Sequence, residues 1–215
     1  MSGAGKVAII DYGAGNVPSV ERAFQCLGAS PVRASTPDAI ASAQALVLPG
    51  VGHFSSLIRA LDEHALRAPL LDAISRGIPF FGICLGLQAL FDSSDESPAL
   101  PGLKIFPGKV ARLPDSAKLP HMGWNQLSRK RERESRLLDG IPAGAFFYFA
   151  HSFAAPLAHA GTGSISESAV AASCTHGAEF IAVLERANIF GVQFHPEKSG
   201  EPGAQLLRNF LRLAS

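Results

Sequence analysis

The sequence predicts an α/β protein whose open, mixed and mainly parallel sheet is flanked by helices. Short apolar runs alternate with helical patterns through the first half of the chain, as expected for strands joined by helical crossovers. Residues 78–83 are apolar on both faces, which is typical of a parallel strand covered by helices. The second half is richer in strand patterns, so further strands are expected there.

The first half is predicted to hold four strands and the helices between them. We expect the strands at residues 6–11, 30–34, 45–48 and 78–83. Asn16 is positioned to cap a first helix that Gly28 ends, and Thr36 is positioned to cap a short second helix. A longer helical stretch at 53–76 is expected to break near Pro69, and another helix is expected at 85–91.

The second half is predicted to add five strands and a final helix. The strand patterns cover residues 103–113, 145–153, 169–175, 179–185 and 188–194, and the helical pattern covers 204–213. Residues 128–136 form a charge run, which favours a solvated loop over the alternative of a partner-docking segment. Because the chain shows neither a repeat nor a linker, we expect one domain over residues 1–215.

Composition excludes several classes of protein. The 215 residues are 47% hydrophobic and 17% charged, which is typical of a globular chain and not of disorder. A formal charge of +1 gives no electrostatic reason to expect nucleic acid or an acidic membrane as a partner. The first apolar run is short and ends at Asp11, so we expect neither a signal peptide nor a membrane span, and a cytoplasmic location. The three cysteines include no C-x-x-C pair, which favours a reducing compartment.

The segment around Cys84 has the pattern of a nucleophile elbow. A buried strand runs into Gly82-Ile83-Cys84-Leu85-Gly86, and a helix is expected to leave it. The two glycines allow a turn in which side chains would collide, and the helix N-terminus would favour the reactive thiolate. The other two cysteines, Cys26 and Cys174, are interpreted as small buried hydrophobic residues.

One histidine has a carboxylate at a useful spacing. His195 and Glu197 are two residues apart, and in an extended segment they would point to the same side, so that Glu197 orients the imidazole toward Cys84. Pro196 is expected to keep this segment extended. Three further histidines are interpreted as surface or helix residues: His53, His64 and His159.

A metal site and an oxyanion site are the remaining local possibilities. Cys174 and His176 could place two ligands on one face of a strand, but no matching second pair exists, so we expect no metal. The loop Pro49-Gly50-Val51-Gly52 follows a strand and offers backbone amides to a developing oxyanion. We expect Gly50 to permit a flip that presents the Val51 amide, with the Leu85 amide as the second donor.

Together, the elbow GICLGLQ, the downstream HPE and the strand-ending PGVG resemble the class I (triad) glutamine amidotransferases over nearly the whole chain. The resemblance implies a flavodoxin-like sheet, no cofactor, and a glutamyl thioester formed on Cys84 with His195 and Glu197 completing the triad. It also implies a set of residues that hold the substrate glutamine: Gly52, Gln88, His151, Ser152 and Phe153.

Further segments narrow the resemblance to one branch of this family, the glutaminase subunits of imidazole glycerol phosphate synthases. These segments are DYGAGN at 11–16, PGVG at 49–52, HMGWN at 121–125, YFAHSF at 148–153 and HPEKS at 195–199. The resemblance implies a heterodimer with a (β/α)₈-barrel cyclase subunit of histidine biosynthesis, to which ammonia is channelled. Asn16, Tyr148 and Lys198 are implied to lie near that interface, and the oxyanion loop is implied to be out of position until the partner binds its own substrate.

Three alternatives remain open. The first is a glutaminase that serves another pathway, such as pyridoxal phosphate, anthranilate or purine synthesis. Leu87, where the anthranilate and carbamoyl phosphate relatives usually have histidine, argues against part of this group. The second is a stand-alone cysteine γ-glutamyl hydrolase, which would be fully active without a partner. The third is a non-catalytic binding relative, against which the complete triad argues.

Overall fold

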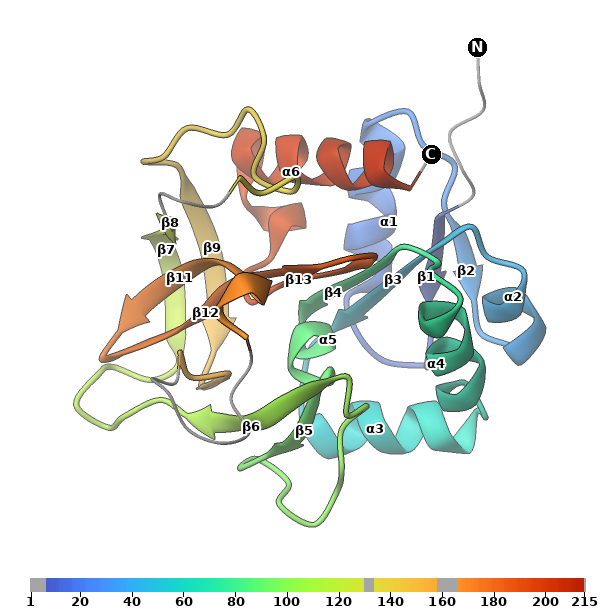
Figure 1. The fold of residues 1–215 in the computed structure, drawn as a ribbon, viewed down its shortest axis with the longest axis horizontal. Helices are drawn as coiled ribbons and strands as arrows, with labels where there is room; N and C mark the ends of the chain where they lie inside the picture. Colours follow the sequence, from blue (N-terminus) through green and yellow to red (C-terminus); the bar gives the residue numbers. More distant parts are fainter. Residues whose placement is uncertain (1–6, 130–133, 158–165, 215) are drawn as a thin grey trace.

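The centre of the molecule is an eight-stranded sheet in the order β2-β1-β3-β4-β13-β12-β11-β8 (Figure 1). The structure is a computed structural model, and it describes residues 7–129, 134–157 and 166–214. The strands of this sheet are β1 Val7–Ile10, β2 Val32–Ala34, β3 Ala45–Gly50, β4 Phe80–Cys84, β8 Ser128–Arg129, β11 Val170–His176, β12 Ala178–Arg186 and β13 Ile189–Val192.

Strand direction divides this sheet into two parts. The five strands from β2 to β13 are parallel, and β13 joins the N-terminal half by pairing Ile189 with Phe80. β12, β11 and β8 continue the sheet with antiparallel pairing. The predicted mixed and mainly parallel α/β sheet is therefore confirmed.

Helices cover both faces of the sheet and create two separate cores. They are α1 Val17–Cys26, α2 Pro37–Ala41, α3 Phe54–Glu63, α4 Arg67–Ser75, α5 Leu85–Gln88 and α6 Gly200–Leu213. One core takes Phe24 of α1 and Phe210 of α6, and the other takes Leu57 of α3 and Leu70 of α4 (Figure 1). Within the described ranges, no helix is both long enough and apolar enough to cross a bilayer.

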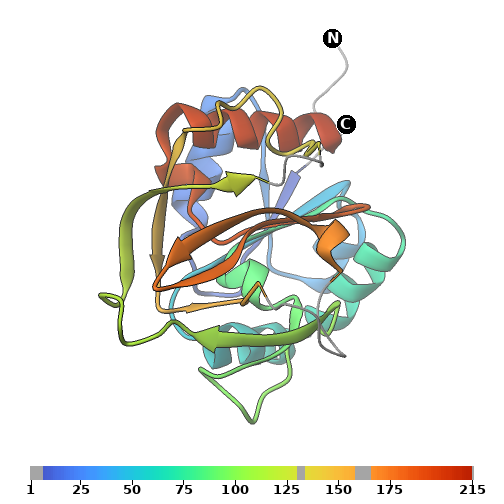
Figure 2. The same cartoon turned by 60° about the vertical axis from the view of Figure 1, so that its left-hand side comes forward.

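Two smaller sheets extend the molecule beside the main one. β10 Phe153–Ala154, β6 Phe106–Arg112 and β5 Phe91–Ser94 form one sheet, and β7 His121–Gln126 pairs with β9 Phe146–His151 in the other (Figure 2). Along β9, buried residues alternate with exposed or half-buried ones, and along β7, buried or half-buried residues alternate with exposed ones. One face of this ribbon therefore packs on the core and the other faces outward. The ribbon carries His151 into the interior.

Several local predictions were wrong. The break in the helical stretch lies at His64–Leu66, where Ala65 has a φ of 55°, and Pro69 sits in the first turn of α4, where the missing N–H has no helical partner to lose. α5 ends at Gln88 instead of 91 because β5 follows. Strands β5, β7 and β8 were not expected.

The predicted roles of Asn16 and Cys26 also need correction. Asn16 occupies the N-cap position of α1, but its side chain makes no capping bond and instead donates to Glu197. Cys26, at the end of α1, is exposed, whereas Cys174 is buried as expected. A helical pattern does not show which side of the last turn faces the core.

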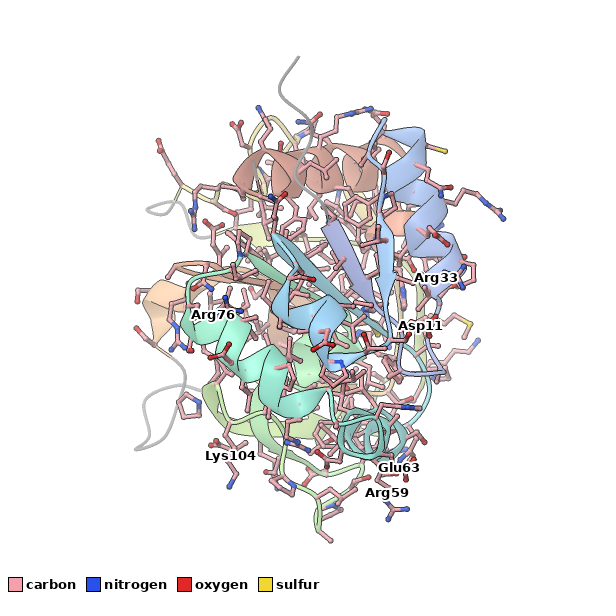
Figure 3. The ribbon with its side chains drawn as sticks, turned by 90° about the vertical axis from the view of Figure 1, so that its right-hand side faces the viewer. Asp11, Arg33, Arg59, Glu63, Arg76 and Lys104 are labelled. Carbon is pink, nitrogen blue, oxygen red and sulfur yellow. The ribbon has the colours of Figure 1, made fainter. Side chains whose placement is uncertain are left out.

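The outer edge of the sheet at β2 carries charge. Arg33 donates to Glu21 at 2.7 Å and lies 3.8 Å from Asp11 (Figure 3). Figure 3 also shows Arg59 and Glu63 of α3 directed away from the sheet. Charged side chains on an edge strand discourage pairing with another chain, so this edge is protected by its own sequence.

Candidate active site

Cys84 lies at a sharp turn between β4 and α5. Its φ of 54° and ψ of −107° place a non-glycine residue in a region of backbone space that side chains rarely adopt. β4 lies between β3 and β13, so both neighbouring strands support this strained residue. Such strain persists at functional sites when the surrounding structure over-determines it. The predicted elbow is present.

Two glycines make this turn possible by allowing close backbone contact. A Cβ on Gly82 would lie 2.6 Å from the Gly86 carbonyl oxygen, and one on Gly86 would lie 1.9 Å from the Leu48 carbonyl oxygen. Both distances are far below a normal contact, and the obstructing atoms are backbone that cannot swing away. Side chains at positions 82 and 86 would therefore collide with the backbone, as expected from the sequence.

Replacing Gly86 with alanine should destabilise the protein strongly, because the new methyl group must displace β3 from α5. We expect a loss of at least about 3 kcal/mol in the free energy of unfolding, measured by urea denaturation. The control is Gly144→Ala, at an exposed site where the added Cβ meets only the Gln126 side chain, at 3.6 Å. Equal stability of the two variants would contradict the close packing described here.

The short length of α5 changes the expected source of thiolate stabilisation. The helix has only 4 residues, and Cys84 occupies its N-cap position. A helix macrodipole is the sum of many aligned peptide dipoles, so a single turn contributes little. The helix dipole is therefore not the main support for a thiolate that the sequence led us to expect.

His195 and Glu197 form a buried pair beside Cys84. The Nδ1 atom of His195 lies 2.9 Å from Oε1 of Glu197, and the two side chains are 3% and 1% exposed. Burial by itself lowers the pKa of His195, but hydrogen bonds and charge from Cys84 and Glu197 outweigh it and raise this pKa to about 10. The imidazole is therefore protonated at neutral pH and places a positive charge beside Cys84.

The pairing of His195 with Glu197 was predicted correctly, but for a reason that was wrong. Pro196 does not hold the segment extended, because Pro196–Lys198 forms a 3₁₀ turn that follows His195 directly. Proline is tolerated at the first position of such a turn, since its missing N–H would be unpaired there. The turn, instead of an extended strand, brings the carboxylate back to Nδ1.

A cavity of about 200 Å³ opens in front of these residues. Pockets of 300–1,000 Å³ are usual for drug-sized ligands, so this one suits a molecule as small as an amino acid. All five predicted substrate residues line it, as do Cys84, His195 and two of the predicted oxyanion residues; the full lining is Val51, Gly52, Cys84, Leu85, Gln88, Glu96, Ala150, His151, Ser152, Phe153, His195 and Lys198.

Gly50 differs from the other predicted oxyanion residues because it does not line the cavity. It is buried at the end of β3 and pairs with Cys84, and a Cβ on it would lie 2.6 Å from the Leu85 Cβ. Its visible role is to let β3 approach α5, whereas Val51 and Gly52 are exposed beside the cavity. The proposed flip of this loop remains a prediction.

Gln88 can offer a ligand only one end of its amide. Its Nε2 atom donates to the Phe153 carbonyl at 2.7 Å and to Oε1 of Gln193 at 3.1 Å, which uses both of its hydrogens. Its Oε1 atom is the end left to accept a hydrogen bond from a ligand.

Glu96 is a cavity residue that the sequence reasoning missed. Its Oε2 atom accepts from the Phe54 amide at 2.7 Å, which fixes the carboxylate at the start of α3. It places a carboxylate at the wall of the cavity that Cys84 also lines. The sequence around it holds several acidic residues, and no local pattern distinguishes this one.

Two buried histidines form a pair behind the cavity. Nδ1 of His121 lies 3.1 Å from Nε2 of His151, whose own Nδ1 lies 2.9 Å from the Phe153 carbonyl. Burial lowers the pKa of His121 to about 4, assisted by His176, and lowers that of His151 to about 3, assisted by His121. Both rings are therefore neutral at neutral pH.

This histidine pair should make the protein less stable in mild acid. Folding lowers the pKa of His121 from 6.5 to about 4, so the unfolded chain binds a proton more readily than the folded protein does. The folded state therefore has its full stability at a pH above 6.5 and loses stability as the pH falls from 6.5 toward 4. His121 should contribute about 2 kcal/mol to the difference in unfolding free energy between pH 7 and pH 5. In His121→Phe, urea denaturation should show that difference reduced, while His64→Gln should retain it. An unchanged difference in His121→Phe would contradict the assignment.

The remaining described histidines lie at separate places in the fold. His53 and His64 lie at the two ends of α3 and are exposed, as expected, whereas His159 lies outside the described residues. His176 stacks on His121 with ring centroids 4.1 Å apart. Among the residues that the structure describes, no group of three potential ligands is placed to hold a metal ion.

The residues predicted at a partner interface surround the outer side of the triad. The Asn16 amide donates to Glu197 at 3.3 Å, and the Lys198 ammonium lies 5.7 Å from the ring centre of Tyr148. Beside Tyr148, the ring of Trp124 is 55% exposed, and Met122 on the same face of β7 is 66% exposed. An apolar surface thus adjoins the cavity.

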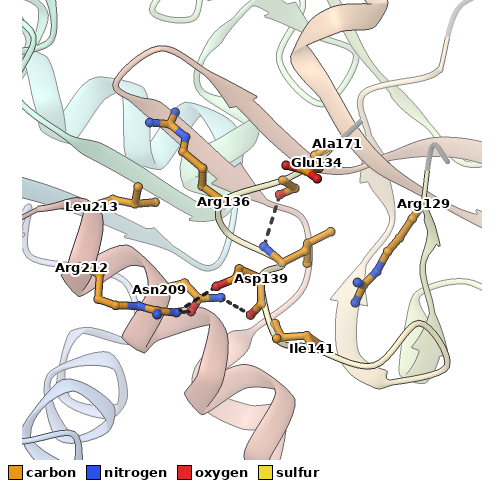
Figure 4. A pocket seen from close by; sticks show the side chains of 12 residues that line it. Arg129, Glu134, Arg136, Asp139, Ile141, Ala171, Asn209, Arg212 and Leu213 are labelled. Atoms are coloured by element: carbon orange, nitrogen blue, oxygen red, sulfur yellow. Dashed lines mark hydrogen bonds and ion pairs between the residues drawn. The ribbon is translucent and has the colours of Figure 1, made fainter. Parts of the chain in front are cut away.

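A larger hollow of about 630 Å³ lies away from this chemistry, between the end of α6 and residues 134–141 (Figure 4). Its described lining contains neither cysteine nor histidine, and within it Arg212 pairs with Asp139 at 3.4 Å. Part of the predicted charge run, residues 130–133, lies outside the described residues. In its described part, Arg136 pairs with Glu185 at 2.6 Å, which ties the run to β12.

Comparison with known proteins identifies the family. The family model for "Glutamine amidotransferase class-I" matches residues 8–214. Among similar solved structures, one titled "Crystal structure of glutamine amidotransferase" has a TM-score of 0.74 at 19% identity and covers 98% of this chain and 99% of its own. The PurLQS structure from Thermotoga maritima has a TM-score of 0.72 at 20% identity, covering 97% and 98%. At such identities the structures support the fold alone.

Similar sequences share more of the chain. A protein from Methanothermobacter thermautotrophicus named "Imidazole glycerol phosphate synthase subunit HisH" is 46% identical over 207 residues, covering 96% of this chain and 98% of that protein. A protein of the same name from Thermosynechococcus vestitus is 46% identical over 211 residues, covering 96% of each. The elbow, the buried His–Glu pair, the family model and these relatives agree: the chain belongs to the class-I glutamine amidotransferase family.

Proposed function

We propose that this protein is the glutaminase subunit of an imidazole glycerol phosphate synthase, which hydrolyses glutamine and delivers the ammonia to a cyclase subunit in histidine biosynthesis. One observation carries the proposal: the strained Cys84 and the buried His195–Glu197 pair meet at a small cavity in a chain 46% identical to proteins of that name.

The reaction begins with the ion pair of Cys84 and His195. The thiolate attacks the carboxamide carbon of glutamine, and the new carbon–sulfur bond leaves a negative charge on the oxygen. Val51 and Leu85 border the cavity on the side where backbone amides can stabilise that charge. When the carbon–nitrogen bond breaks, His195 gives its proton to the departing nitrogen, and ammonia leaves.

Water completes the cycle. The now neutral His195 takes a proton from water, and the resulting hydroxide attacks the glutamyl thioester. The carbon–sulfur bond breaks, glutamate is released, and the thiolate and the imidazolium are restored. Glu197 holds His195 in the correct orientation through its 2.9 Å contact with Nδ1.

The cavity supplies groups for both ends of glutamine. Glu96 is positioned to pair with the α-ammonium group, and Oε1 of Gln88 can accept a hydrogen bond from the substrate. The segment His151–Phe153 also lines the cavity, where it can contact the glutamine backbone. These contacts would place the carboxamide at the sulfur.

The partner is a (β/α)₈-barrel cyclase bound over the apolar surface next to the cavity. We define the β7–β9 patch as Met122, Trp124, Phe146 and Tyr148, which share one face of the ribbon. Three of these side chains are more than half exposed, which is unusual for such large apolar groups. Lys198 both lines the cavity and contacts Tyr148, so a partner seated here would lie close to the released ammonia.

Reconstitution tests the proposed function. Glutaminase activity is measured for the lone subunit, for its complex with a barrel cyclase, and for that complex with the cyclase ligand bound. The proposal expects the rate to rise along this series and ammonia to appear in the cyclase product. Equal rates in all three states would exclude coupling between the two sites and would favour the stand-alone γ-glutamyl hydrolase.

Replacing Trp124 with aspartate should weaken the complex at least tenfold, because an exposed aromatic side chain at the centre of an apolar patch is a typical binding hot spot. Isothermal titration calorimetry with the cyclase measures the effect. The matched control is Val32→Asp, which changes another exposed apolar residue on the opposite edge strand β2. Equal affinities of the two variants would place the partner elsewhere.

A further inference from the structure

Gln193 is a buried polar residue next to the nucleophile. It follows β13, two positions before His195, and its side chain is fully buried. Its backbone amide donates to the Ala182 carbonyl at 3.0 Å, which anchors it to β12. Its Nε2 atom lies 3.6 Å from the Cys84 sulfur, within hydrogen-bond range for sulfur.

The orientation of the Gln193 amide is determined by the Phe153 carbonyl, to which it is linked through Gln88 by two hydrogen bonds. The Phe153 oxygen can only accept, so Gln88 must direct its NH₂ group toward it. The second hydrogen of that NH₂ group then points at Gln193, which must present its Oε1 atom, at 3.1 Å. Gln193 is left with its own NH₂ group facing the Cys84 sulfur. The opposite orientation would set two donors against each other and a carbonyl oxygen against a thiolate.

We infer that Gln193 is a positioning residue for the nucleophile, which donates an N–H to the Cys84 sulfur, favours its thiolate form and couples it to Gln88. The inference rests on the proposed function only in naming Cys84 as the nucleophile. Gln193 does not line the cavity, so it acts through Cys84 and not on the substrate.

The sulfur needs such a donor because its other supports are limited. α5 is a single turn and contributes little dipole, and the proton of His195 is transferred during each cycle. A hydrogen bond to the charged form of a group favours that form. Because the Gln193 amide is neutral and cannot give its hydrogen away, it stabilises the thiolate both before attack and when the thioester breaks.

The hydrogen-bonded chain also links the nucleophile to substrate binding. Gln88 holds Gln193 through one hydrogen and Phe153 through the other, and the Phe153 carbonyl also accepts from His151. Residues on three separate segments therefore share one network that ends on the sulfur. A change in Gln193 should alter the reactivity of Cys84 without removing any group that touches glutamine.

The test measures alkylation of Cys84 by iodoacetamide across pH in the full-length protein, with each cysteine followed by peptide mass spectrometry. Gln193→Met removes the donor at similar size, and Gln193→Glu replaces the NH₂ group with an oxygen. In both variants we expect the midpoint of the Cys84 profile to rise by roughly one pH unit. At a pH well below both midpoints this corresponds to a rate of alkylation about tenfold lower. The exposed Cys26 is an internal reference whose profile should not move.

A matched control separates this effect from general damage to the core. Asn209 on α6 is another buried amide, and it donates to the carbonyls of Leu137 and Asp139. Asn209→Asp makes the same exchange of NH₂ for oxygen and should leave the Cys84 midpoint unchanged. Near-ultraviolet circular dichroism establishes which variants are folded, and Gln193→Asn, which withdraws the amide by one methylene, serves if Gln193→Met and Gln193→Glu do not fold.

The inference is overturned if folded Gln193 variants show the wild-type Cys84 midpoint, or if Asn209→Asp shifts it by the same amount. Glutamine hydrolysis is measured on the same samples. If the midpoint shifts in the Gln193 variants, but the wild-type subunit shows no glutaminase activity even in complex with the barrel cyclase and its ligand, the proposed function is refuted and the role of Gln193 stays intact. If the wild-type enzyme is active but the Gln193 variants show no shift in the Cys84 midpoint, the role of Gln193 is refuted and the proposed function stays intact.

Discussion

Replacing Cys84 with alanine should abolish glutamine hydrolysis, with a loss of about 10⁴-fold or more in kcat. Among the described residues that line the cavity, only Cys84 has both a strained backbone conformation and a side chain paired with an imidazolium. Removal of its sulfur therefore leaves no route to the thioester. The cavity walls keep Glu96 and Gln88, and glutamine should still bind. Ammonia release measures the loss, and isothermal titration calorimetry measures the retained affinity.

The other two cysteines provide the controls for this prediction. Cys26→Ala changes an exposed thiol at the end of α1, and Cys174→Ala changes a buried thiol whose pKa burial raises to about 12. Neither residue lines the cavity. Both variants should hydrolyse glutamine at the wild-type rate if they fold. A Cys84→Ala protein that retains activity would require another nucleophile and would refute the mechanism.

Replacing His195 with asparagine should lower kcat by about 10³- to 10⁴-fold while changing KM little. The variant loses the proton that ammonia needs to leave and the base that activates water. It also removes the positive charge that pairs with the Cys84 thiolate, so alkylation of Cys84 at neutral pH should slow as well. Steady-state kinetics and the iodoacetamide reaction give these two results separately.

His64→Gln is the control for His195→Asn, because His64 is exposed at the end of α3 and remote from the elbow. It should behave as the wild-type protein in both assays. Unchanged kcat in His195→Asn would show that the buried pair has a structural role only, and that the proton is supplied by another group.

The elbow was predictable from the sequence because its requirements are local. Gly82 and Gly86 flank Cys84 within five residues, and the collisions that demand glycine occur within the same turn or with the adjacent strand. The parallel strands were predictable for a similar reason, since burial on both faces leaves continuous apolar runs such as 78–83. Local patterns thus identified the nucleophile and the layers around it.

Contacts made by distant segments could not be predicted in this way. Glu96 and Gln193 reach the site through folding alone, and their surrounding sequences resemble those of ordinary surface and strand residues. The ribbon of β7 and β9 was missed in part because HMGWN contains a glycine and alternates over few residues. The contact between His195 and Glu197 was predicted correctly, although the predicted extended backbone was wrong, because Pro196–Lys198 forms a 3₁₀ turn.

Trapping of the covalent intermediate tests the central claim most directly. The protein is mixed with glutamine, quenched in acid within one turnover, and digested for mass spectrometry. The mechanism predicts a glutamyl group attached to the peptide that contains Cys84, absent when Cys84 is alanine. Hydrolysis of glutamine with no adduct on Cys84 at any time, or with an adduct on a different residue, would contradict it.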